Sequence, residues 1–151
     1  MGNALCAIEG EDRLTLPGFV RDTLLRRSDA RLIFVGRHES DPCLVAYDRG
    51  VTPGLARDCR RRRFAEALAD PDAHHARARR AFGFVEPLEL DRRGKVTLSP
   101  ILRRLARIQG GALVIGTGAA FEIWNPDLAL ESDDAGLREL AGLSLEFQLA
   151  A

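Results

Sequence analysis

Two short segments of the sequence place an acid four residues before a base. Glu9 precedes Arg13 in IEGEDRLTLP, and Asp91 precedes Lys95 in LDRRGKVTLSP. An acid at this spacing can hold the base by a charge-assisted hydrogen bond and leave other donors free for phosphate or for guanine O6 and N7. The repeated pattern is chemically suited to a contact with nucleic acid. The candidate DNA-binding residues are Glu9, Arg13, Asp91, Arg92, Arg93 and Lys95.

These segments also have a purely structural interpretation. Acidic and basic residues around turns commonly form exposed ion pairs, each of which adds about 0 to 1 kcal/mol to stability. On charge and spacing alone, we favour this interpretation over a contact with DNA.

The similarity between the two segments continues beyond them. In both, the base is followed by an apolar residue, a threonine and a leucine. Further on, Phe34-Val35-Gly36 matches Val114-Ile115-Gly116, and the run from Leu44 to Asp48 matches the run from Phe121 to Asn125. A chain of 151 residues is about one ordinary domain long, so two halves this short must share a core. The sequence predicts two tandem half-domains in one compact unit.

The apolar pattern predicts the elements that position the acids and bases. Strand patterns lie on either side of each acid-to-base turn, and each second strand leads into a helix and then a pair of strands. The expected strands are residues 4–8, 13–16, 31–36, 43–48, 84–90, 95–98, 112–115 and 120–124. One helix is expected directly after Pro17-Gly18, and three more are expected over residues 52–68, 71–82 and 100–106. Asp70 is the expected N-cap of the helix over residues 71–82. A terminal helix is expected to contain Leu137, Leu140 and Leu143.

From these elements we predict four consecutive parts. Residues 3–50 form the first half-domain, 51–83 a helical connector, 84–128 the second half-domain and 129–151 an acidic C-terminal tail. In fold class this is α+β and mainly β, with two βαββ-type halves and peripheral helices.

Composition and charge argue against a disordered or fibrous protein and against a chain that is basic all over. With 46% hydrophobic and 29% charged residues the chain is an ordinary globular protein, and its formal net charge is zero. Its charge is nevertheless uneven, which suggests a basic working surface and an acidic flank, although solvated helix faces explain it equally well. The basic cluster holds Arg57, Arg60, Arg61, Arg62, Arg63, Arg77, Arg79 and Arg80, and the tail holds Glu131, Asp133, Asp134, Glu139 and Glu146.

No pattern in the sequence indicates catalysis, a cofactor or a metal. Cys6, Cys43 and Cys59 have no C-x-x-C spacing, which favours reduced thiols in a cytoplasmic protein. The adjacent His74 and His75 would point about 100° apart on a helix and are poorly placed to share a metal ion. No apolar stretch approaches the length of a membrane span. We therefore expect a protein that is not an enzyme, with no cofactor, no small-molecule substrate and no membrane partner.

The segment DRRGKVTLSPILRRLARIQGGALVIGTGAAFEIWN, from Asp91 to Asn125, resembles the second half of the MraZ family. These transcriptional regulators of the division and cell wall gene cluster are built from two AbrB-like (SpoVT/AbrB) half-domains. Their signature is Asp-x-x-x-Arg in each half, followed by a strand, a proline-started helix and a strand ending in Glu-x-Trp. The second half supplies Asp91, Gly94, Lys95, Pro100, Gly116 and Glu122-Ile123-Trp124, and the Arg-rich connector is similar too.

The resemblance implies a pseudo-dimeric β-barrel of swapped-hairpin type and a repressor that binds double-stranded DNA. It implies promoter direct repeats as the target, a ring-like homo-oligomer, and a location in the cytoplasm at the nucleoid. In this role Arg13 and Lys95 contact DNA, and Glu9 and Asp91 orient them.

The chain departs from the family pattern at three positions: Glu9 replaces Asp, Asp12 replaces Gly, and Lys95 replaces Arg. Lysine keeps the charge of arginine and loses its planar fork, whereas aspartate tolerates the left-handed turn conformation. An alternative is therefore an oligomeric interaction protein on the same fold with weakened or lost DNA binding. An antitoxin of the AbrB type is disfavoured, because such proteins usually carry one half-domain.

Overall fold

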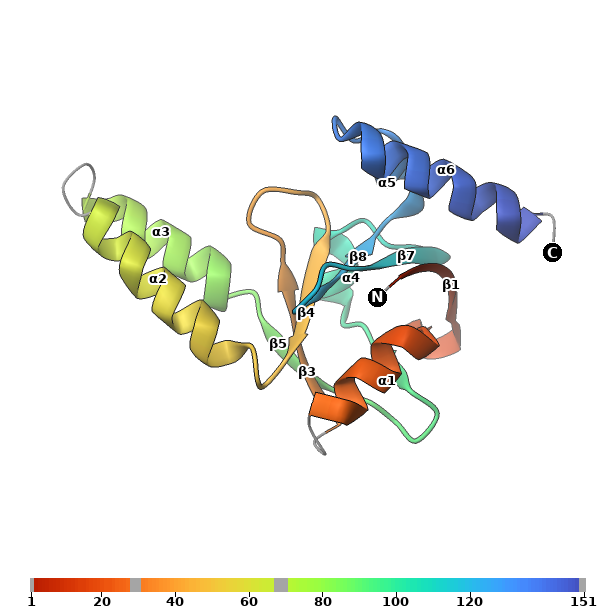
Figure 1. Ribbon diagram of the computed structural model, residues 1–151, viewed down its shortest axis with the longest axis horizontal. Helices are drawn as coiled ribbons and strands as arrows, with labels where there is room; N and C mark the ends of the chain where they lie inside the picture. Colours follow the sequence, from red (N-terminus) through yellow and green to blue (C-terminus); the bar gives the residue numbers. More distant parts are fainter. Residues whose placement is uncertain (1, 28–30, 67–70, 150–151) are drawn as a thin grey trace.

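The strands of this protein are short, because turn residues interrupt its apolar segments every few positions. The computed structural model describes residues 2–27, 31–66 and 71–149. Its strands are β1 (Asn3–Glu9), β2 (Arg13–Thr15), β3 (Leu32–Arg37), β4 (Leu44–Asp48), β5 (Glu86–Glu89), β6 (Lys95–Thr97), β7 (Gly111–Gly116) and β8 (Phe121–Trp124). The helices, shown with the strands in Figure 1, are η1 (Gly10–Asp12), α1 (Gly18–Arg27), α2 (Thr52–Glu66), α3 (Pro71–Phe82), α4 (Pro100–Leu105), α5 (Pro126–Leu130) and α6 (Ala135–Leu149).

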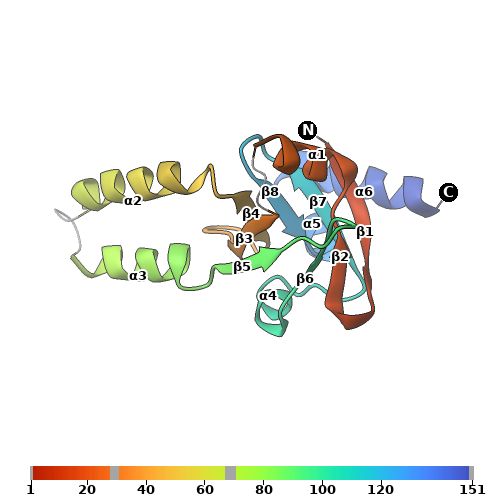
Figure 2. The same ribbon diagram turned by 90° about the horizontal axis from the view of Figure 1, so that it is seen from below.

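The eight strands form one antiparallel sheet whose order shows an internal symmetry. The order is β5-β3-β4-β8-β7-β1-β2-β6. If the two end strands, β5 and β6, are taken as neighbours around a barrel, exchanging β1 to β4 with β5 to β8 gives the same circular order in the opposite direction. The first strand of each half pairs with the hairpin of the other half: β1 lies along β7, and β5 lies along β3. This exchange confirms the predicted α+β fold of swapped-hairpin type, with helices around a barrel-like sheet (Figure 2).

The pairing of β2 with β6 joins the two halves at the symmetry axis. Leu14 lies opposite Val96 in this pair. Two equivalent backbone bonds extend it: the Leu16 N–H donates to the Gly94 carbonyl and the Leu98 N–H to the Asp12 carbonyl, both at 3.0 Å. The turn between β5 and β6, which stand at the two ends of the strand order, nearly closes the sheet into a barrel.

The barrel is filled by apolar side chains that alternate along the strands of both halves. The two halves share this core, as the length of the chain predicts. Its fully buried members include Leu14, Leu16, Val35, Leu44, Val96, Leu98, Leu102, Val114 and Ile123.

A second apolar cluster lies between the sheet and the C-terminal helices. Trp124, Leu113 and Cys43 are buried here against Ala129 of α5 and Ala141 of α6. The predicted terminal helix is therefore present as α6. The short helix α5 was not expected from the sequence; it begins at Asn125, whose side chain accepts the N–H of Asp127 at 2.8 Å.

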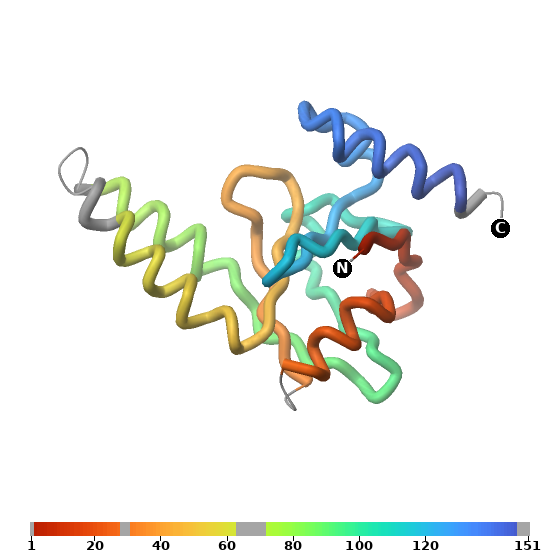
Figure 3. The backbone as a smooth tube through the Cα atoms, viewed as in Figure 1, coloured from red at the N-terminus to blue at the C-terminus, as the bar shows by residue number. Residues whose placement is uncertain are grey.

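The helices α2 and α3 form an arm that projects from the barrel (Figure 3). They connect β4 to β5, where the sequence predicts two helices. The first of these predicted helices ends with residues 67 and 68, and the second has Asp70 as its predicted N-cap. These three residues lie outside the described ranges. Within the described ranges, no helix is both long and apolar enough to cross a membrane.

Because Leu14 lies at the contact between the halves, its truncation tests the shared core. We expect Leu14→Ala to lower the free energy of unfolding by about 2 to 5 kcal/mol, since a fully buried leucine leaves a cavity. Urea denaturation measures this loss. Leu25→Ala, at a side chain that is 59% exposed, is the control and should change stability far less. Two separate unfolding transitions in either variant would contradict a shared core.

Candidate nucleic-acid interface

The structure gathers Glu9, Arg13, Asp91 and Lys95 into one polar cluster on the outside of the barrel. Glu9 lies opposite Arg13 in the β1–β2 pair, and Lys95 lies opposite Thr15 in the β2–β6 pair. Side chains alternate between the two faces of a strand, so burial of the neighbours of Arg13 and Lys95 leaves these bases facing outward. The two acid-to-base segments, which are 82 positions apart in sequence, thus meet in space.

The partners within this polar cluster differ from the expected ones. The ammonium group of Lys95 binds the Glu9 carboxylate, an ion pair that crosses between the halves. Arg13 instead binds the carboxylate of Glu11 at 2.9 Å. The expected pairing of each acid with the base of its own half is therefore wrong, because the β2–β6 register brings Lys95 beside the first half. Lys95 is 19% exposed and Arg13 is 46% exposed.

Asp91 shapes the second turn through backbone contacts. One of its carboxylate oxygens accepts the N–H groups of Arg93 at 2.8 Å and Lys95 at 2.9 Å. Gly94 follows with a φ of 76°, a conformation that glycine adopts without steric cost. The hydrogen bond that the backbone N–H of Lys95 donates is the main reason that the pKa of Asp91 is lowered. The hydrogen bond from the Lys95 side chain is the main cause that lowers the pKa of Glu9.

The two turns carry opposite charge, a difference that the spacing of acids and bases does not reveal. The first turn, residues 9–13, contains three acids and one base. The second turn, residues 91–95, contains one acid and three bases, and its Arg92 and Arg93 are exposed. This signal is present in the sequence, because EGEDR and DRRGK differ in charge at equal spacing. Only the second turn presents a surface suited to an anionic partner.

Asp12, at the position equivalent to Gly94, has the left-handed conformation expected of it. Its φ is 60°, close to the 76° of the equivalent Gly94. Its carboxylate forms an ion pair with Arg103 of α4, so its charge has a partner other than Arg13. The departure at this position is therefore accommodated by a residue of the other half.

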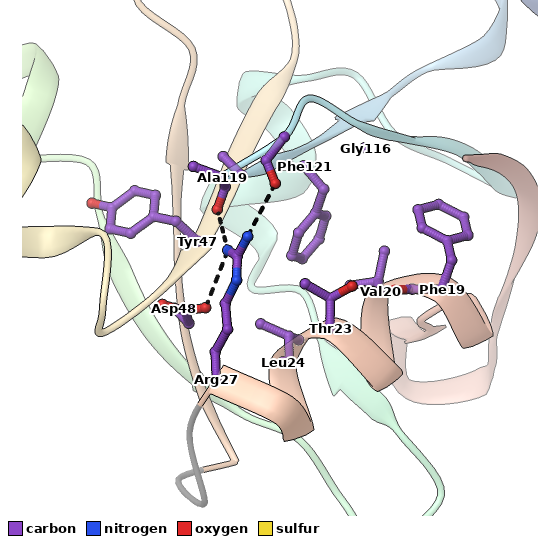
Figure 4. A pocket seen from close by; sticks show the side chains of 12 residues that line it. Phe19, Val20, Thr23, Leu24, Arg27, Tyr47, Asp48, Gly116, Ala119 and Phe121 are labelled. Atoms are coloured by element: carbon purple, nitrogen blue, oxygen red, sulfur yellow. Dashed lines mark hydrogen bonds and ion pairs between the residues drawn. The ribbon is translucent and has the colours of Figure 1, made fainter. Parts of the chain in front are cut away.

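A cavity of about 320 Å³ lies between α1, the end of β4 and the β7–β8 turn (Figure 4). Asp48, 2% exposed, accepts the N–H of Gly50 at 2.8 Å and lies 3.5 Å from the Arg27 guanidinium. Arg27 also donates to the carbonyl of Ala119 at 2.9 Å. These polar groups connect α1, β4 and the turn, so their contacts are structural.

The remaining reactive groups offer little chemistry. Burial raises the pKa of the Cys6 thiol to about 11 and also raises that of Cys43, so both thiols are protonated near neutral pH. In the part of the chain that the structure describes, no group of three or more His, Cys, Asp or Glu side chains is placed to hold a metal ion.

The sequences of several known proteins align with most of this chain. A protein named transcriptional regulator MraZ from Saccharophagus degradans is 29% identical over 83% of this chain and 82% of its own length. Proteins of the same name from Thermomicrobium roseum and Bordetella pertussis are 29% and 28% identical, over 84% and 82% of this chain and 82% and 80% of their own lengths. No family model matches the sequence.

The ion pair of Glu9 with Lys95 predicts an acid-sensitive stability. A carboxyl whose pKa is lowered by folding stabilises the folded state above the unfolded-state pKa of about 4, and this contribution is lost as the pH falls through the lower folded value. We expect Lys95→Met to bring the pKa of Glu9 back toward its usual range in an NMR titration of the carboxyl carbons. An ordinary Glu9 titration in the unmodified protein would contradict the pair.

Proposed function

We propose that this chain, a member of the MraZ family of transcriptional regulators, binds double-stranded DNA through the second turn and the polar cluster. The observation that carries the proposal is the basic second turn on the outside of the barrel, with Arg92 and Arg93 exposed and Lys95 at its end. DNA presents closely spaced phosphate charges, so a surface with several bases gains affinity by releasing counterions.

Each base retains donors for such contacts. Lys95 has three ammonium protons and uses one bond with Glu9, and the Arg13 guanidinium has five N–H donors and uses one bond with Glu11. Arg92 and Arg93 are exposed and reach solvent from the turn itself. In this proposal Glu9 orients Lys95, and Asp91 fixes the backbone from which all three bases of the second turn project.

The biological role that fits this surface is repression of the division and cell wall gene cluster. The target would be short direct repeats in the promoter upstream of the chain's own gene, bound at the nucleoid in the cytoplasm. The names of the related proteins support regulation of transcription, and the bases of the second turn support contact with the promoter.

The first turn favours a second candidate function. Glu9 and Glu11 pair with the two bases of the polar cluster, and Asp12 pairs with Arg103. A protein whose bases are neutralised in this way could instead act as an oligomeric interaction scaffold with weakened DNA binding. DNA titrations separate the two functions.

We also propose that copies of the chain associate head to tail into a ring-like homo-oligomer. The arm of α2 and α3 lies at one end of the molecule and α6 at the other (Figures 1 and 2). The basic arm of one copy can bind the acidic start of α6 in the next copy, and such a heterologous contact closes into a ring when its rotation permits. The exposed bases of the arm include Arg57, Arg60, Arg79 and Arg80, and the exposed acids around the start of α6 include Glu131, Asp133, Asp134 and Glu139.

Removal of single bases tests the DNA surface. We expect Arg92→Ala, Arg93→Ala, Arg13→Ala and Lys95→Ala each to weaken binding to the upstream fragment and to reduce the slope of log K against log salt by about 1 for each lost phosphate contact. Fluorescence anisotropy over a salt series measures both quantities, and a scrambled fragment gives the non-specific affinity.

The acidic first turn supplies the matched control for these variants. Glu11→Gln removes an exposed negative charge and frees Arg13, so DNA affinity should stay equal or rise. Binding by the unmodified protein that does not exceed binding to scrambled DNA, or base variants that bind as the unmodified protein does, would support the interaction scaffold instead.

Charge reversal tests the head-to-tail association. We expect Arg60→Glu with Arg79→Glu to dissociate the oligomer, as should Glu131→Arg with Asp133→Arg, whereas a chain with all four changes should regain complementary ends and reassociate. Native mass spectrometry and light scattering give the subunit number. Arg104→Glu on α4 is the control, and an oligomer unaffected by either reversed end would exclude this contact.

A further inference from the structure

Arg21 of α1 lies against the second turn, which belongs to the other half of the chain. Its guanidinium donates to the carbonyl of Arg93 at 3.2 Å, and Figure 1 shows the turn between β5 and β6 passing beside α1. Gly94 allows this approach, because a Cβ at that position would lie 2.1 Å from Cδ of Arg21. Gly94 is therefore required by its neighbour as well as by its φ of 76°.

Arg103 of α4 makes the equivalent contact in the opposite direction. Its guanidinium binds the carboxylate of Asp12 in the first turn, and it also donates to the carbonyls of Ile108 at 3.2 Å and Gln109 at 3.3 Å. Arg103 follows Asp91 by the same number of residues as Arg21 follows Glu9. The two arginines are thus equivalent positions of the repeat, each in contact with the turn of the other half.

The register of β2 and β6 explains why the contacts cross. These strands are antiparallel, so the residue after β2 that leads into α1 lies beside the second turn, and the residue after β6 that leads into α4 lies beside the first turn. The bonds from Leu16 to Gly94 and from Leu98 to Asp12 mark these two places. Each helix therefore starts next to the turn that its own half does not supply.

The two contacts differ in charge. Arg103 has an acidic partner, whereas within the described chain Arg21 forms no ion pair and its Nε is buried without a hydrogen-bond partner. A buried donor without a hydrogen-bond partner is unfavourable, so Arg21 makes its contact with the second turn despite the cost of its own desolvation. Its contact fixes a backbone carbonyl between the exposed Arg92 and the cluster residue Lys95.

We propose that Arg21 and Arg103 are positioning residues that hold the turns of the opposite halves, and that Arg21 pre-organises the second turn for DNA. The DNA part of this inference rests on the proposed function. A turn already held in its binding conformation loses less conformational entropy when it binds, and this raises affinity without any direct contact. Arg21 acts through Arg92, Arg93 and Lys95, so its loss should weaken binding without changing the number of phosphate contacts.

Hydrogen exchange of the free protein tests the crossed contacts independently of DNA. Arg21→Met keeps the apolar stem beside Gly94 and removes the guanidinium; it should speed amide exchange in residues 90–97 and leave the first turn, residues 9–13, unchanged. Arg103→Met should give the reverse pattern. Arg26→Met is the matched control, because Arg26 lies exposed on the same helix and, among the residues that the structure describes, donates to the carbonyl of Asp22 of its own helix.

DNA titrations over a salt series then test positioning. We expect Arg21→Met to weaken specific binding about tenfold with an unchanged salt slope, Arg21→Lys to restore part of the affinity, and Arg26→Met to change it less than about twofold. A slope reduced by about 1 in Arg21→Met would make Arg21 a phosphate contact and overturn the positioning role.

The two parts of the inference fail separately. Unchanged exchange in residues 90–97 of Arg21→Met overturns the crossed contact, whatever the DNA result. If the unmodified protein binds no DNA, the proposed function and the positioning of the turn for DNA are both overturned, while the exchange pattern still decides whether each arginine holds the opposite turn.

Discussion

The pairing of β2 with β6 is the constraint on which the rest of the structure depends. These strands contain three residues each, yet their register places Leu14 against Val96 in the core and Lys95 beside the first half on the outside. It also sets α1 beside the second turn. Since β1 and β5 are exchanged between the halves, neither half can complete its sheet or its core alone. A local change in this register would therefore displace the core, the polar cluster and both arginine contacts together.

Much of the fold was predictable because the repeat is visible in the sequence. Matching strands and turns imply two similar halves, and halves too short for separate cores must share one. The left-handed conformation at Asp12 also follows from residue type and position. The helix α5 was not predictable in the same way, because five residues provide little helical periodicity and its stability depends on packing under α6.

The pairing within the polar cluster could not be predicted, for a different physical reason. Sequence spacing places Glu9 near Arg13, but ion pairs are decided by which side chains meet across neighbouring strands, and that depends on the exchange between halves. Lys95 therefore binds Glu9, while Asp91 is occupied by backbone N–H groups of its own turn. The opposite charges of the two turns were available in the sequence, and a comparison of equivalent positions by charge as well as by spacing finds them.

The charge difference between the turns bears on how such a molecule would read DNA. Two equally basic turns related by a two-fold axis would suit a palindromic site, as symmetric dimers do. Here only the second turn is basic, so one copy offers one directional surface. Copies joined head to tail repeat that surface in the same orientation, which matches sites repeated in the same direction along the duplex. An acidic first turn, in which Asp12 stands where the MraZ pattern has glycine, therefore fits the proposed direct repeats better than a symmetric pair of basic turns would.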